Sequence, residues 1–197
     1  MHSVSRKILT SVAILGVFGA LAGAGVFASF SSATDNSANA ITAGTVALAD
    51  NDGGVALYTA SNAKPGDVKT SCIRVSYTGS LDADVKLYIG DAIGALGDYV
   101  NLTIEPGTQA SPTFPSCTNF VSDGSGTIYS GTLKAFATAH PSYATGLADN
   151  PGTTATKWAT NDAVVYRITA TVDSATPDAQ QGATTSAHKL SWGARNQ

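Results

Sequence analysis

Residues whose side chains catalyse reactions or bind metals are few in this chain of 197 residues, and they lie far apart. Beyond the N-terminal segment the histidines are His140 and His188, and neither belongs to an HExxH motif or another metal-ligand spacing. No GxSxG motif is present. A Ser–His–Asp triad built from distant segments stays open, because such triads assemble in space. We predict that both histidines are structural, that no metal or other cofactor is bound, and that the protein is not an enzyme.

Acidic residues gather at two positions, and neither predicts a site. The run Asp50-Asn51-Asp52-Gly53-Gly54 resembles the start of a calcium loop, but no Glu follows at the distance of the bidentate ligand. We interpret it as a polar turn between two strands. Asp82 and Asp84 stand at the start of a predicted strand, where carboxylates at this spacing commonly face solvent. We assign them no role in acid–base catalysis.

Cys72 and Cys117 are the two cysteines of the chain. In an exported protein an isolated pair favours one disulfide, and two buried free thiols are the alternative. Zinc binding is not indicated, because neither a CxxC motif nor a nearby His completes a ligand set. A disulfide closing a loop of this size would stabilise the fold by about 4 kcal/mol in the chain-entropy account.

The N-terminal segment has the composition of a secretory signal. Arg6 and Lys7 are followed by twenty-one uncharged residues, 8–28, which are rich in Gly and Ala. We predict a signal peptide over 1–29, with cleavage in the region of Ala28, Ser29 and Phe30. A retained anchor is the alternative, because a helix of this length is about 30 Å long and could span a bilayer. Cleavage predicts a secreted protein, extracellular or at the cell surface.

Charge gives no basis for nucleic-acid binding. The formal net charge is −3, and Lys and Arg form no run or patch. Glu105 is the single Glu, and the remainder is rich in Thr, Ser, Gly and Val, which do not favour long helices.

Alternation of apolar and polar residues between turn signals predicts an all-β fold. We expect a jelly-roll-like two-sheet β-sandwich with one short helix and long loops, preceded by the signal helix. The helix is expected at 134–140, and the long loops at 108–126 and 142–156. Expected strands cover 55–58, 68–77, 83–90, 99–105 (ended by Pro106-Gly107), 127–133, 163–172 and a last one around 188–192.

Several landmarks resemble one known family when they are taken in order along the chain. They are Gly25 to Ser31, Ile41 to Leu48, Ala63 to Asp67, Ile73 to Leu81, Gly126 to Leu133, Asp178 to Gly182 and Trp192 to Gln197. Together they resemble the TasA/camelysin (CalY) family of exported bacterial matrix proteins. The Cys pair and the Pro- and Ser-rich central loop depart from the better-known members of that family.

The resemblance implies a structural protein that polymerises into extracellular biofilm fibres. A SipW-type signal peptidase would read the cleavage region, and the freed segment 30–43 would add as a strand to the next subunit's 44–197 domain. Such β-augmentation uses main-chain hydrogen bonds for affinity and alternate side chains for packing. The partners implied are further copies of the chain, with other matrix or cell-surface components possible. The packing residues of the donor strand are expected to be Phe30, Ala33, Ala38, Ala40 and Ile41.

Other interpretations stay open at this stage. Segment 30–43 is polar, so a flexible tail is the alternative to a donor strand. A secreted camelysin-like metallopeptidase and a monomeric surface adhesin that binds through its long loops are the alternative functions.

Overall fold

The computed structural model describes residues 43–196. The predicted signal peptide, the cleavage region at Ala28, Ser29 and Phe30, and the donor residues therefore lie outside the described residues. Those donor residues are Phe30, Ala33, Ala38, Ala40 and Ile41. Among the described residues no helix is both long and apolar enough to cross a membrane.

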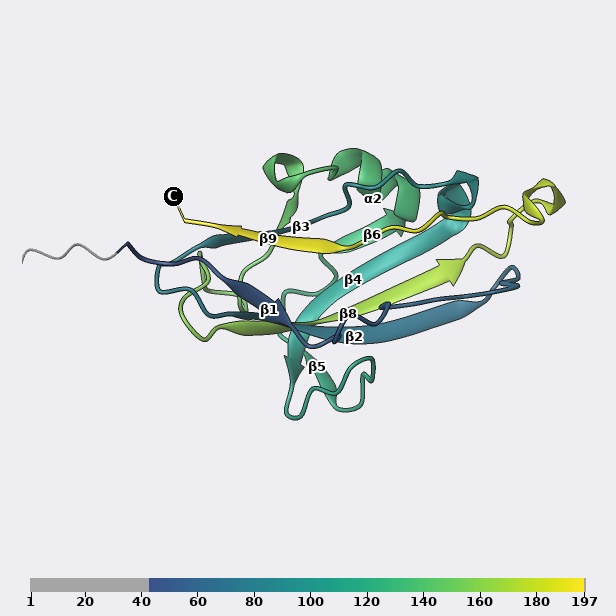
Figure 1. Cartoon of the computed structure of the whole chain (residues 1–197). Helices are drawn as coiled ribbons and strands as arrows, with labels where there is room; N and C mark the ends of the chain where they lie inside the picture. Colours follow the sequence, from purple (N-terminus) through teal and green to yellow (C-terminus); the bar gives the residue numbers. More distant parts are fainter. Residues whose placement is uncertain (1–42, 197) are drawn as a thin grey trace, which may run out of the picture. The chain divides into compact units, whose positions relative to one another are not determined.

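Two antiparallel sheets form the domain, with helix α2 and loops beside them (Figure 1). The larger sheet has the order β1-β2-β8-β4-β5, and β6 pairs with β4 next to β5; the smaller has the order β7-β3-β9. This confirms the predicted all-β two-sheet sandwich. The strands of the larger sheet are β1 (Leu48–Asp50), β2 (Val68–Tyr77), β8 (Ala163–Val172), β4 (Val100–Gln109), β5 (Phe120–Ser122) and β6 (Tyr129–Thr132). Those of the smaller are β7 (Leu147–Ala148), β3 (Asp84–Tyr88) and β9 (Ser191–Arg195).

Alternating side chains of the long strands build the core between the sheets. In β3, Val85 and Leu87 are buried while their neighbours are partly exposed, which is the predicted pattern. Strand β8 has the predicted bounds and lies between β2 and β4. Fully burying one such aliphatic side chain contributes roughly 1.5–3 kcal/mol. The largest fully buried side chains are Trp158, Tyr77, Tyr166, Phe136, Leu87, Ile89, Leu102, Ile104, Leu133 and Ile168.

Strand β4 continues through Pro106-Gly107, so the prediction that these residues end it was wrong. The carbonyl of Pro106 accepts a hydrogen bond from the Asp123 N–H, which places the backbone groups of Pro106 on the β5/β6 side. On that side β6 pairs only as far as Ile104, and the pairing with β5 begins at Gly107. Proline lacks an N–H, and here it lies at the junction where neither neighbour requires one.

The prediction of a first strand at 55–58 was also wrong. These residues form a loop, and the first strand is β1 at Leu48–Asp50. Leu57 and Tyr58 both pack against the core, whereas Val55 is 62% exposed. The side chains of Leu57 and Tyr58 therefore reach the core from a loop whose backbone does not pair in a sheet.

The predicted helix at 134–140 is present as α2 (Leu133–Ala139). The hydroxyl of Thr132 accepts a hydrogen bond from the Ala135 N–H and caps its first turn, while Pro141 follows its end. Three short 3-10 helices complete the helical elements of the described residues: η1 (Ala95–Tyr99), η2 (Tyr143–Thr145) and η3 (Asp178–Gln180).

The predicted long loops contain short strands that sequence patterns did not reveal. Strand β4 extends to Gln109 and β5 lies inside the predicted loop 108–126, while η2 and β7 lie inside 142–156. The last strand begins at Ser191, later than predicted. Strands of two or three residues have too little alternation to be recognised in sequence.

Candidate functional site: the open edges of β1 and β9

Strand β1 forms one edge of the larger sheet, and its outer backbone groups have no strand partner among residues 43–196. The Ala47 carbonyl accepts from Thr78 N–H, and the Thr45 carbonyl accepts from Ser80 N–H. Alternation along a strand then directs the N–H and C=O groups of Val46, Leu48 and Asp50 away from β2. The outward backbone N–H and C=O groups of these three residues therefore form an edge that pairs with no described strand.

Strand β9 forms an edge of the smaller sheet in the same way. The Val85 carbonyl accepts from Asp149 N–H on the far side of β3, so the even-numbered residues of β3 face β9. Lys86 and Gly193 are therefore a hydrogen-bonded pair in the ladder. The N–H and C=O groups of Trp192 and Ala194 point to the opposite side, where the described chain provides no strand.

The two edges lie on the same side of the sandwich. β1 contacts β9, and in Figure 1 the two strands lie near each other, with β1 slanting away from β9. Residues 46–50 and 190–194 together are called the open seam below. Its apolar side chains are partly buried and pack against the core: Val46, Leu48, Leu190, Trp192 and Ala194.

An edge with unpaired N–H and C=O groups is a template for another strand. At the open seam an extended segment could pair with either sheet and cover the partly buried apolar side chains at the same time. Pairing with β9 would enlarge the smaller sheet from three strands to four. The seam thus offers both features that strand addition requires, namely backbone pairing and side-chain packing.

A hydrogen bond between Tyr58 and His188 joins the segments that flank the open seam. The Tyr58 hydroxyl lies 2.7 Å from Nε2 of His188, and Nδ1 of His188 lies 3.0 Å from the Ser186 carbonyl oxygen. A carbonyl only accepts, so neutral His188 carries its proton on Nδ1 and accepts the Tyr58 O–H at Nε2. Burial raises the pKa of Tyr58, so the phenol remains a donor at neutral pH.

The second histidine is also held by a backbone group. Nδ1 of His140 lies 2.7 Å from the Thr145 carbonyl oxygen, and its ring packs on Phe136 with centroids 4.8 Å apart. The structure thus gives both histidines the structural contacts that the sequence predicted.

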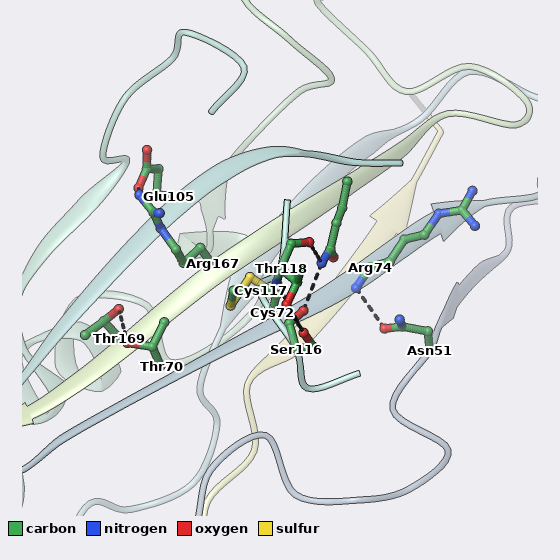
Figure 2. The surroundings of a disulfide bond; sticks show 11 residues. Asn51, Thr70, Cys72, Arg74, Glu105, Ser116, Cys117, Thr118, Arg167 and Thr169 are labelled. Carbon is green, nitrogen blue, oxygen red and sulfur yellow. Dashed lines mark hydrogen bonds and ion pairs between the residues drawn. A yellow bond between two sulfur atoms is a disulfide. The ribbon is translucent and has the colours of Figure 1, made fainter. Parts of the chain in front are cut away.

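Cys72 and Cys117 form the predicted disulfide, which joins β2 to the loop between β4 and β5 (Figure 2). The Cα atoms are 5.1 Å apart. The Gln109 side-chain amide donates to the Ser116 carbonyl at 3.0 Å and to the Thr118 carbonyl at 2.6 Å. Covalent and hydrogen bonds together hold this loop on the outer face of the larger sheet.

An ion pair lies on the same face as the disulfide. Arg167 donates to the carboxylate of Glu105, with Nε at 3.1 Å from Oε2 (Figure 2). Its guanidinium also covers the Phe120 ring, 4.6 Å from the ring centroid. Farther along the sheet, the hydroxyls of Thr70 and Thr169 are 3.1 Å apart. These contacts link neighbouring strands and indicate a structural face.

The run from Asp50 to Gly54 forms a turn stabilised by its own side chains. Asp50 Oδ1 accepts from the Asp52 N–H at 3.2 Å, and Asp52 Oδ1 accepts from the Gly54 N–H at 2.6 Å. Asn51 Oδ1 accepts from the Arg74 N–H of β2 at 2.8 Å. The side-chain oxygens face different backbone donors, which favours the predicted polar turn over a calcium loop.

Asp82 and Asp84 do not form a carboxylate pair. Asp84 instead forms an ion pair with Lys157, whose Nζ lies 3.0 and 3.1 Å from its two oxygens. Asp82 is exposed.

The described residues do not fit a peptidase zinc site. Within residues 43–196 no group of three or more His, Cys, Asp or Glu side chains is placed to hold a metal. The two histidines are engaged with backbone carbonyls, and the two cysteines with each other. Catalytic zinc needs three protein ligands around one open position, and this part of the chain supplies no such set.

The sequence placed Leu48 and Trp192 within family landmarks but did not predict that they lie at sheet edges. Trp192 was expected in the last strand, around 188–192, but its position at a sheet edge depends on strand order and register. The only signal available was the position of 41–48, at the start of the predicted domain. Whether the five donor residues fit the seam is outside the described structure.

A comparison with protein families finds a match to the family described as camelysin metallo-endopeptidase, over residues 3–92. No curated protein matches the chain. The matched region includes most of the predicted signal peptide, the 41–48 landmark, β1, β2 and β3. The match therefore confirms the resemblance to the TasA/camelysin family across residues 3–92 of this chain.

Proposed function

We propose that this protein is an exported structural protein that polymerises into extracellular matrix fibres. Segment 30–43 of one copy would add as a strand at the open seam of the next. The observation that supports this proposal is the pair of unpaired edges, β1 and β9, on one side of the sandwich. Camelysin family members are extracellular or cell-surface proteins, and we extend that location to this chain.

Energetics require apolar burial as well as backbone pairing. The outer groups of Val46, Leu48 and Asp50 could form up to about six hydrogen bonds, each contributing about 0.5–1.5 kcal/mol. Ordering the donor backbone costs about 1–2 kcal/mol per residue, so hydrogen bonds alone do not offset the lost entropy. Burial of donor side chains must therefore contribute as well, and Phe30 and Ile41 would each add roughly 1.5–3 kcal/mol if fully buried against the seam.

Geometry then determines the kind of assembly. The donor and the acceptor are different surfaces of the same chain, so the contact is head-to-tail and, without rotational closure, gives filaments. Cleavage in the region of Ala28, Ser29 and Phe30 by a SipW-type signal peptidase would free the donor. Processing would therefore act as the switch for assembly.

Two proline variants test the acceptor edge. Ala194→Pro removes an N–H that points to the open side, whereas Gly193→Pro removes one that belongs to the β3–β9 ladder. We expect Ala194→Pro to fold and to lose fibre formation, and Gly193→Pro to lower the melting temperature. If folded Ala194→Pro formed fibres at the wild-type rate, β9 would not be the acceptor edge. Leu48→Pro tests β1 as the acceptor edge in the same way, with Ala49→Pro as its control.

The metallopeptidase interpretation is not proposed, because the described side chains do not fit the metal set that the family's name implies. That the protein is not an enzyme remains a prediction. A protease assay with and without chelator tests it, and chelator-sensitive proteolysis by pure protein would contradict it.

A further inference from the structure

Segment 30–43, the proposed donor, carries a single charged side chain, that of Asp35. A carboxylate that a neighbouring chain covers needs a cationic partner or hydrogen bonds, so Asp35 restricts where the segment can pair. The two edges of the open seam differ in charge. The charge of Asp35 can therefore distinguish β9 from β1 as the acceptor edge.

Arg195 is the last residue of β9, and it is exposed. Its guanidinium carbon lies 4.3 Å from the centroid of the Tyr143 ring. A Cβ atom on Gly193 would lie 2.9 Å from Cδ2 of Tyr143, so this ring lies directly over β9. A guanidinium stacked on an aromatic ring keeps its N–H groups available for a carboxylate. Stacking on Tyr143 therefore orders a cation on the strand whose other side is open.

The outer face of the smaller sheet is positively charged around Arg195. Nζ of Lys86 lies 5.4 Å from the same ring centroid. Asp84, which is opposite Arg195 in the β3–β9 ladder, forms its ion pair with Lys157 instead, at 3.0 Å. Arg195 and Lys86 thus have no carboxylate partner among residues 43–196. A donor carboxylate would add the negative charge that this face lacks.

The edge at β1 is acidic. Asp50 is the last residue of the strand and Asp52 follows it, while residues 46–50 contain no Lys or Arg. Arg74 lies on β2, one strand farther from this edge. A donor carboxylate would therefore meet like charges along β1 and an unpaired cation at β9. Exposed ion pairs contribute little to affinity, but complementary and repulsive charges select the register and exclude wrong partners.

We propose that segment 30–43 of the next copy pairs with the open side of β9, in the register that places Asp35 beside Arg195. This assignment rests on the proposed function, strand donation between copies of the chain. Directly opposite residues on neighbouring strands have Cβ atoms roughly 4.5–5.5 Å apart, which allows an ion pair between Asp and Arg. Asp35 is then the residue that sets the register of the donor.

This register also decides which donor side chains face the core. Side chains alternate along a strand, so donor residues an odd number of positions from Asp35 lie on the side opposite to it. Among the expected packing residues these are Phe30, Ala38 and Ala40. Phe30 rather than Ile41 would then be the largest donor side chain to pack beside Trp192 and Ala194, which pack against the core.

Charge reversal with rescue tests the register in proteins that begin at Phe30. We expect Asp35→Lys and Arg195→Asp each to slow fibre growth about five-fold at low ionic strength, and the double variant to recover the wild-type rate. Asp178→Lys changes the net charge as Asp35→Lys does, at an exposed position elsewhere, and should grow as the wild type does. Light scattering measures growth, and circular dichroism checks that each variant folds.

The outcomes separate the register from strand donation itself. If the wild type forms no fibres, strand donation is wrong and the register with it. If the wild type forms fibres and the two single variants grow equally fast, strand donation stands and the pairing of Asp35 with Arg195 is overturned. Slow single variants that the double variant does not rescue would overturn the pairing as well.

Cysteine cross-linking provides a second readout, which reports position rather than rate. Asp35→Cys with Arg195→Cys should link neighbouring subunits by disulfides as fibres grow, and the multimers should appear on a non-reducing gel. Asp35→Cys with Ala49→Cys is the matched control, because Ala49 is an exposed residue of β1, opposite Ser76 of β2. Fibres whose Arg195→Cys subunits stay unlinked, or whose Ala49→Cys subunits link equally well, would overturn the proposal.

Discussion

The hydroxyl of Tyr58 and the Nε2 atom of His188 are 2.7 Å apart, although 130 positions separate these residues in the chain. This bond connects the loop after β1 with the segment before β9. It therefore holds together the two segments that flank the open seam.

Removing this hydroxyl should destabilise the protein measurably. Tyr58→Phe keeps the ring packed against the core but leaves Nε2 of His188 without its donor, so we expect a loss of about 1 kcal/mol in the free energy of unfolding. Urea denaturation measures it. Tyr88→Phe on β3 is the control, for which we expect a change within about 0.5 kcal/mol; equal losses in both variants would contradict the role of the hydrogen bond.

The disulfide should be a major source of stability. Replacing both cysteines, in Cys72→Ser with Cys117→Ser, releases a loop closed across 45 positions, so we expect a loss of about 4 kcal/mol in the chain-entropy account. Guanidinium denaturation of the variant and of the oxidised wild type measures the difference. Identical midpoints, or no effect of reductant on the wild type, would show that this bond does not stabilise the folded state.

Stability should fall at alkaline pH because of buried phenols. Burial raises the pKa of Tyr58 and Tyr166 above the ordinary value of about 10, so the folded state favours the neutral form. The contribution of these two phenols to the free energy of unfolding is complete below pH about 10. It is lost as the pH rises further, because the tyrosines of the unfolded chain ionise at a lower pH than the buried ones. Melting temperatures from pH about 8 to about 11 should decline above about 10, with phenolate absorbance appearing together with unfolding. A constant melting temperature over that range would contradict this account.

Regular alternation made part of the fold predictable. In β8, Val164, Tyr166 and Ile168 are buried, and the strand has the predicted bounds, because both neighbouring strands continue along its length. The disulfide was also predictable, because an isolated cysteine pair in an exported chain has few other uses.

The remaining features depend on contacts between distant segments. Pro106 is tolerated in β4 only because β6 ends and β5 begins beside it, and no local pattern encodes that junction. The sequence around Leu57 and Tyr58 resembles that of a strand, but the two side chains pack against the core from a loop. Strand order decides that Leu48 and Trp192 lie at edges, so the open seam became visible only in the folded domain.

Negative-stain microscopy of two purified forms tests strand donation most directly. One form begins at Phe30 and the other at Gly44, and circular dichroism should give both the same β spectrum, because the described strands begin at Leu48. The account predicts fibres from the form beginning at Phe30 and single particles from the form beginning at Gly44. Fibres of equal length and number from both forms would contradict it.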